Sequence, residues 1–178
     1  MAIPAGTHKL GPDNATLSVK TGRTGPAAPA GHNLVINVTK WEATVDIGAD
    51  PAASSLSLTA DGGSLKVQSG EGGAKGLSDK DKKNIEGSID KDVLKKGNVS
   101  FASTSVAATD GGLLVTGDLT LNGKTKPITF DLRVGDDGAL SGAAKLTQTD
   151  HDMKVFSAMF GALKVTDEVE VVIEGSLA

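Results

Sequence analysis

From Ala15 onward, the chain alternates between apolar and polar residues in short runs that are rich in Val, Leu, Ile and Thr. Alternation with a period of two places successive side chains on opposite faces of a half-buried strand. Glycine-rich and Asp-Gly turn signals separate the runs. The pattern therefore predicts strands over residues 15–20, 34–47, 55–60, 64–69, 99–108, 112–121, 124–134, 139–149 and 169–174.

The run 34–47 changes its parity once. Its first apolar residues occupy even positions, and from Trp41 onward the apolar residues occupy odd positions. A β-bulge inserts one residue into a strand and so exchanges the two faces. The pattern predicts one long strand with a bulge near Thr39–Lys40, and such a bend helps a sheet to curl.

One segment has a helical period instead. Ser78 is followed three residues later by Asp81, which resembles a capping box. Apolar residues then recur at every fourth position, at Ile85, Ile89 and Val93. We therefore predict one amphipathic helix over residues 79–94, lying across the sheet with its lysines in water.

Many evenly spaced antiparallel strands with one helix are typical of an all-β barrel rather than an α/β sheet. The chain has 178 residues, enough for one well-buried core. We expect a single domain over residues 1–178: one closed antiparallel, lipocalin-like β-barrel of about eight strands. A barrel of that size has room for one small ligand.

The composition narrows the function classes. The net charge of −4 works against a general role on nucleic acids or on anionic lipid surfaces. The absence of cysteine excludes disulfides and thiolate chemistry. With one tryptophan, no tyrosine and four phenylalanines, the chain has few rings on which bases could stack. We expect no nucleic-acid partner.

The first residues, 1–7, show no basic region followed by an apolar run, and no segment approaches eighteen consecutive apolar residues. We therefore expect no signal peptide and no transmembrane segment. A cytoplasmic location is the simpler expectation, and a periplasmic or secreted one holds if a leader has been removed.

Three segments carry a family resemblance. They are FASTSV at 101–106, VTGDLTLNGKTKPITF at 115–130 and LKVTDEVEV at 163–171. They resemble the YceI-like family, whose members are described as bacterial lipocalin-like barrels that bind polyisoprenoids or other long apolar lipids. The resemblance covers nearly the whole chain. It implies an apolar lipid as the partner, held inside the barrel.

Apolar residues that suit a ligand gather late in the chain. Met153, Phe156, Met159 and Phe160 fall within eight residues and have helix-like spacing between two strands. Methionine adapts to irregular apolar surfaces, so these side chains are candidates for a flexible lid over the barrel mouth. The alternative is that they close the barrel as ordinary core.

The inner wall is expected to include the aromatic side chains of Trp41, Phe101 and Phe130. His32 and His151 are candidates for contact with a ligand head group, although a structural hydrogen bond and a solvated loop are the simpler interpretations. The three histidines are scattered without metal-ligand spacing. No nucleophile elbow and no phosphate-binding loop is found. We expect no catalytic residues, no metal and no cofactor.

Three functions follow, in order of preference. The first is non-enzymatic binding, storage or transport of an isoprenoid or fatty-acid type of lipid inside the barrel. The second is a structural or regulatory barrel with a side-chain-filled core, acting through its surface or as a homodimer. The third, an enzyme acting on a lipid, would need convergent titratable groups inside the barrel.

Overall fold

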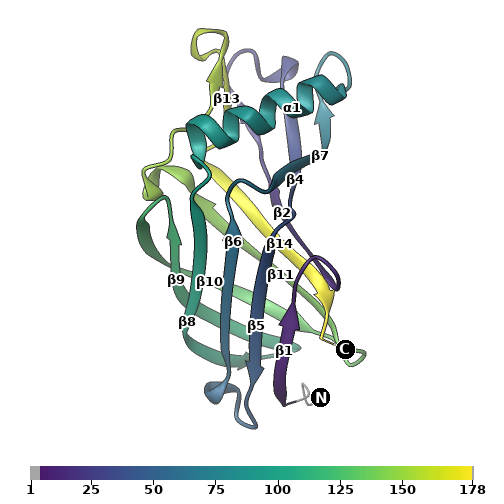
Figure 1. Ribbon diagram of the computed structural model, residues 1–178, viewed down its shortest axis with the longest axis vertical. Helices are drawn as coiled ribbons and strands as arrows, with labels where there is room; N and C mark the ends of the chain where they lie inside the picture. Colours follow the sequence, from purple (N-terminus) through teal and green to yellow (C-terminus); the bar gives the residue numbers. More distant parts are fainter. Residues whose placement is uncertain (1–4, 178) are drawn as a thin grey trace.

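In the part of the chain that the structure describes, eleven antiparallel strands form the main sheet, which curls strongly around an interior (Figure 1). The computed structural model describes residues 5–177. In spatial order the strands are β1 (Gly6–Leu10), β5 (Trp41–Ile47), β6 (Ser55–Asp61), β8 (Asn98–Thr109), β9 (Gly112–Leu121), β10 (Lys124–Val134), β11 (Ala139–Thr147), β14 (Glu168–Ser176), β2 (Ala15–Lys20), β4 (His32–Val38) and β7 (Leu65–Gly72). The predicted all-β, lipocalin-like class is confirmed.

The remaining elements lie mostly at one end of the curled sheet (Figure 1). A small sheet has the order β12 (Ser157–Ala158), β13 (Leu163–Val165) and β3 (Arg23–Thr24). The helical elements are α1 (Asp79–Ser88), the π-helical turn η3 (Ile89–Val93) and the 3₁₀ turns η1 (Ala28–Ala30), η2 (Pro51–Ala53), η4 (Gln148–His151) and η5 (Met159–Gly161). None of the helices within residues 5–177 is long and apolar enough to cross a membrane.

The predicted bulge near Thr39–Lys40 is wrong, because the chain breaks there into two strands. β4 pairs with β2 and β7, whereas β5 pairs with β1 and β6. The break is bridged by backbone bonds from the Thr39 amide to the Ser64 carbonyl and from the Asp61 amide to the Lys40 carbonyl, both 3.0 Å. Apolar residues on either side of it still face inward, so the parity shift reflects an exchange of partners.

This break also decides how the barrel closes. In the described part of the chain the hydrogen-bonded sheet is open, since its terminal strands β1 and β7 do not pair. Through the broken strand, however, the ring continues from β2 to β4, into β5, and on through β6, β8, β9, β10, β11 and β14 back to β2. The expected eight positions are therefore present, but the number of separate strands is larger than expected.

The helix follows its predicted signals closely. The Ser78 Oγ accepts from the Asp81 amide at 3.2 Å, and the Asp81 carboxylate accepts from the Ser78 amide at 2.9 Å, which completes the capping box. The α-helix ends at Ser88, earlier than predicted, and η3 continues the same direction as a wider turn. The helix lies across one end of the barrel (Figure 1), as expected.

One predicted strand ends early near the C-terminus, and one sequence pattern there takes a different form. The strand expected over 139–149 ends at Thr147, where η4 begins. The helix-like spacing of Met153, Phe156, Met159 and Phe160 corresponds to no α-helix but to an irregular segment followed by the hairpin β12–β13. Pairing of Ser157 with Lys164 and of β13 with β3 favours the extended conformation there.

Candidate functional site

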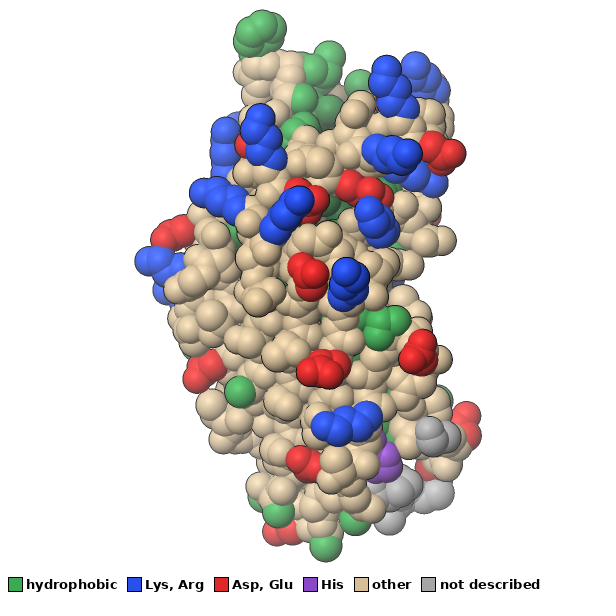
Figure 2. Space-filling model, viewed as in Figure 1, with side chains coloured by type: hydrophobic (Ala, Val, Ile, Leu, Met, Phe, Trp, Pro, Cys, Tyr) green, Lys and Arg blue, Asp and Glu red, His purple; other side chains and the backbone are tan. Residues whose placement is uncertain are grey.

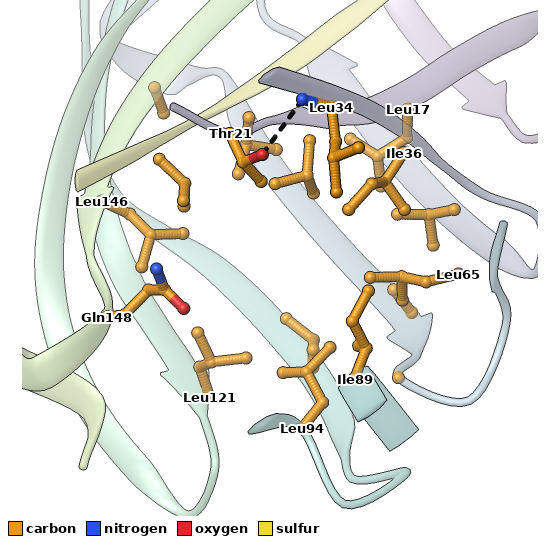
Figure 3. Close-up of a pocket in the computed structure, with 18 of the residues that line it drawn as sticks. Leu17, Thr21, Leu34, Ile36, Leu65, Ile89, Leu94, Leu121, Leu146 and Gln148 are labelled. Atoms are coloured by element: carbon orange, nitrogen blue, oxygen red, sulfur yellow. Dashed lines mark hydrogen bonds between the residues drawn. The ribbon is translucent and has the colours of Figure 1, made fainter. Parts of the chain in front are cut away.

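A cavity of about 500 Å³ lies inside the curled sheet, beneath α1. Figure 3 shows aliphatic side chains from several strands and from η3 pointing toward one another around it. The aliphatic lining comes from opposite walls and includes Leu17, Val19, Leu34, Ile36, Leu58, Leu65, Ile89, Leu119, Leu121, Leu146, Val171 and Ile173. The interior of this barrel is therefore not filled by its own side chains.

The space arises from the sizes of the inward-facing residues. Alternate residues of a strand face the interior, and in β11 these include Gly142 and Ala144 as well as larger side chains. Ala43 and Ala60 occupy inward positions on the opposite side of the ring. Small side chains at these positions leave volume that Leu or Phe would fill.

The helix α1 forms the roof. Its Ile85 side chain, and Ile89 just after it, line the cavity and pack on the apolar cluster of β4 and β7. Glu86 holds the helix in place, since one carboxylate oxygen accepts from the Val67 amide at 3.0 Å and the other pairs with Lys66 at 3.2 Å. None of the side chains of α1 is fully buried. The roof is therefore held by partly buried apolar side chains and by the bonds of Glu86.

Few polar groups face the cavity, and some of them already form hydrogen bonds with other groups of the protein. The buried Gln148 side chain donates through Nε2 to the Thr166 carbonyl at 3.0 Å. The Thr21 hydroxyl accepts from the Leu34 amide at 3.2 Å (Figure 3). Such a cavity selects its occupant mainly by shape and apolar surface.

Most of the titratable lining residues form hydrogen bonds within the protein. Arg23 donates to the Gly31 carbonyl, the Nε2 of His32 lies 2.8 Å from the Lys75 carbonyl oxygen, and the Asp61 carboxylate accepts from the Gly63 amide at 2.8 Å. Lys164 also lines the cavity. Within residues 5–177, no three His, Asp or Glu side chains are grouped closely enough to hold a metal ion.

Five of the nine residues singled out from the sequence line the cavity. These are His32, Phe101, Phe130, Met153 and Phe156. The rings of Phe101 and Phe130 contact each other, with centroids 5.6 Å apart and planes at 57°. Their contact with a ligand stays a prediction.

The other four lie elsewhere. Trp41 and His151 are buried outside the cavity wall, and the Trp41 Nε1 and both His151 ring nitrogens have no hydrogen-bond partner among the described residues. Met159 and Phe160 stand at the exposed tip of the β12–β13 hairpin, away from the cavity, rather than over it. Their turn directs both side chains outward, so the expected lid is wrong for these two.

Sequence reasoning missed most of the lining. The aliphatic wall was detectable from strand parity, yet parity alone does not separate residues that line a cavity from residues that fill a core. Gln148 is expected inside a strand, and Thr21 and Arg23 lie outside every predicted element. No sequence signal distinguished these three polar residues.

Comparisons of the sequence and of the fold with known proteins agree on one family. The sequence profile of the YceI-like domain matches residues 12–177. The fold is similar to that of BcnA from Burkholderia cenocepacia, with a TM-score of 0.66 and 20% identity over 90% of this chain and 94% of that one. No curated protein matches the chain.

Two further structures share the fold. The YceI protein of Campylobacter jejuni has a TM-score of 0.56 and 18% identity over 78% of this chain and 81% of that one. A polyisoprenoid-binding domain from Saccharophagus degradans, implicated in plant cell wall breakdown, has a TM-score of 0.55 and 8% identity over 97% and 99%. At these identities the likeness concerns the fold.

Proposed function

The chain belongs to the YceI-like domain family, and on that premise we propose that it binds a long apolar lipid of the isoprenoid or fatty-acid type inside its barrel. It stores or transports this lipid and catalyses no reaction on it. The polyisoprenoid-binding domain from Saccharophagus degradans, which has the same fold, supports this choice of ligand class.

The observation that carries the proposal is the aliphatic cavity. Its volume of about 500 Å³ falls in the ordinary range for small-molecule sites. Its walls come from strands on both sides of the ring, so an occupant would be surrounded rather than laid on a surface. A branched or straight hydrocarbon chain fits such walls without requiring a hydrogen-bond partner.

The free energy of burying a hydrocarbon chain in this cavity is large enough for micromolar affinity. Each buried methylene contributes about 0.8 kcal/mol, so ten buried carbons contribute on the order of 8 kcal/mol. Loss of free motion and ordering of the chain offset several kcal/mol of this. A longer tail therefore reaches micromolar affinity without a strong polar contact.

The cavity also bears on the alternatives. A barrel acting only through its surface, with a filled core, has no need of this volume. An enzyme needs a positioned acid, base or nucleophile. Of the titratable lining residues, Arg23 donates to the Gly31 carbonyl, His32 contacts the Lys75 carbonyl and Asp61 accepts from the Gly63 amide, while Lys164 also lines the cavity. Binding without catalysis is the function that these features support best.

The test is identification of the bound molecule. Native mass spectrometry of freshly purified protein should show a mass above that of the chain, and solvent extraction should release one class of apolar molecule. Purified protein should also bind a fluorescent fatty-acid analogue with micromolar affinity after extraction. Protein that carries no apolar molecule and binds no such probe would contradict the proposal.

A further inference from the structure

The hairpin β12–β13 exposes unusually large apolar side chains at its tip. Phe160 is fully exposed, Met159 is 59% exposed and Phe156, nearer the base, is 41% exposed. Apart from Leu114 on β9, these are the large hydrophobic residues that the described part of the chain leaves most exposed. The hairpin stands out beyond α1 at one end of the molecule (Figure 1).

The tip keeps these residues in an unfavourable backbone conformation. Met159 and Phe160 both have positive φ angles, 53° and 55°, a conformation that disfavours side chains with a Cβ. The bond from the Ala162 amide to the Met159 carbonyl, 3.1 Å, closes the turn around Phe160 and Gly161. Tight turns usually place Asn-Gly at such a central pair, as this chain does at Asn122-Gly123, with φ angles of 53° and 73°. Gly161 suits its position, whereas the turn itself does not explain Met at 159 and Phe at 160.

The two chain segments that carry and adjoin the tip are basic and apolar, although Glu170 lies opposite Lys20 in the β14–β2 pairing. The hairpin segment 153–165 and the adjoining segment 20–32 contain the cations Lys20, Arg23, Lys154 and Lys164 and no carboxylate, although the whole chain has a net charge of −4. The two segments are joined by the β13–β3 pairing and by a bond from the Ala27 amide to the Ala162 carbonyl. Figure 2 shows Lys and Arg concentrated in this half of the molecule, with hydrophobic side chains at its extreme end.

The hairpin is also continuous with the cavity. Phe156 at its base and Leu163 on its second strand line the cavity, as do Ala30 and Gly31 of the neighbouring loop. An occupant near this end of the cavity would therefore lie against the hairpin. Exposed apolar residues flanked by cations are the features that hold a protein at the interface of an anionic bilayer.

We propose that the Met159–Phe160 tip inserts into the interface of an anionic lipid bilayer and sets this end of the cavity against the membrane. The net charge of −4 works against such a surface, but the charge is unevenly distributed, and the segments that flank the tip carry cations. The docking rests on the tip alone. That a lipid then passes between bilayer and cavity rests on the proposed function.

The test is flotation of the full chain with vesicles. We expect binding to phosphatidylcholine vesicles that contain phosphatidylglycerol, weakening as salt is raised, and little binding to phosphatidylcholine alone. The double variant Met159→Asn, Phe160→Gly should bind anionic vesicles at least tenfold more weakly. Because Asn and Gly both tolerate a positive φ, its thermal midpoint should be equal to or above that of the unmodified chain. Leu114→Ser, which removes an exposed apolar residue elsewhere, should bind vesicles as before.

Other outcomes separate the possibilities. Undiminished vesicle binding by the double variant, or no binding by the unmodified chain at low salt, would overturn the proposal. A tip variant that changes only the oligomeric state in light scattering would assign the tip to a second copy of the chain and would overturn it as well. Binding of the fluorescent fatty-acid analogue without vesicles should be the same in the double variant. Loss of that probe binding in every form would instead remove the proposed function and leave the docking intact.

Discussion

The most direct test of the cavity as the ligand site is to fill part of it with a larger side chain from one wall. Ala144 on β11 pairs with Val171 on β14, and both side chains face the interior and line the cavity. Because Ala144 is only half buried, the structure leaves open space in front of its methyl group. The substitution Ala144→Phe should therefore place an aromatic ring in the cavity without displacing packed neighbours.

The expected loss of affinity follows from the number of ligand methylene groups that the phenyl ring excludes from the cavity. A phenyl group in this space excludes roughly four methylenes of a ligand, and at about 0.8 kcal/mol each the loss is about 3 kcal/mol. Since about 1.4 kcal/mol corresponds to a factor of ten, the affinity for a long-chain ligand should fall by about a hundredfold.

The assay is a titration with the fluorescent fatty-acid analogue, with thermal unfolding measured in parallel. Ala139→Phe is the matched control, because Ala139 is on the same strand, is exposed and is not among the residues that line the cavity. That control should bind the probe as the unmodified chain does. A folded Ala144→Phe protein that binds as tightly as the control would refute the assignment of the ligand to this cavity.

Three further predictions concern stability. Phe101→Ala removes a buried ring that packs on Phe130 and should lower the free energy of unfolding by about 3–5 kcal/mol in urea titrations, whereas a loss under 1 kcal/mol would contradict that packing. His151→Leu should raise it by about 1 kcal/mol, because an apolar side chain replaces two buried ring nitrogens that have no partner among the described residues, and a lower unfolding midpoint would count against this. Ser78→Ala should cost about 1 kcal/mol through loss of the helix cap, measured as earlier loss of helical circular dichroism on heating. The Ser78 hydroxyl, and then its backbone amide, hold the pKa of Asp81 below its ordinary value, so this cap is fully present above that value and is lost as the pH falls through the folded pKa. An acid titration in which Ser78→Ala and the unmodified chain lose helix at the same pH would refute this.

Much of the sheet was predictable because alternation depends only on which face of a strand is buried. Residues on both sides of Thr39–Lys40 do face inward, as their parity indicates. Whether the shift between them is a bulge or a break depends on which strands pair on either side. That is decided by residues distant in the sequence, and the local pattern is the same in both cases.

The site was predictable only in part, for a related reason. Parity places Trp41 and Phe101 alike on the inner face, but Phe101 lines the cavity and Trp41 packs in the core away from it. The depth of a residue along the barrel follows from the register between strands. At the hairpin, the spacing of Met159 and Phe160 resembles a helix, and two adjacent left-handed residues of these types have no sequence signature.

The attachment of α1 has a consequence for association between molecules. β7 is an edge strand with a hydrogen-bonded neighbour, β4, on one side only, and free N–H and C=O groups on such an edge are a template for aggregation. The carboxylate of Glu86 accepts from the Val67 amide, and Lys82 donates to the Gln68 carbonyl at 3.4 Å. The helix α1 thus occupies these backbone groups of β7, so a strand of another molecule cannot bond to them. Detachment of the helix would expose a sheet edge at which copies of the chain can join.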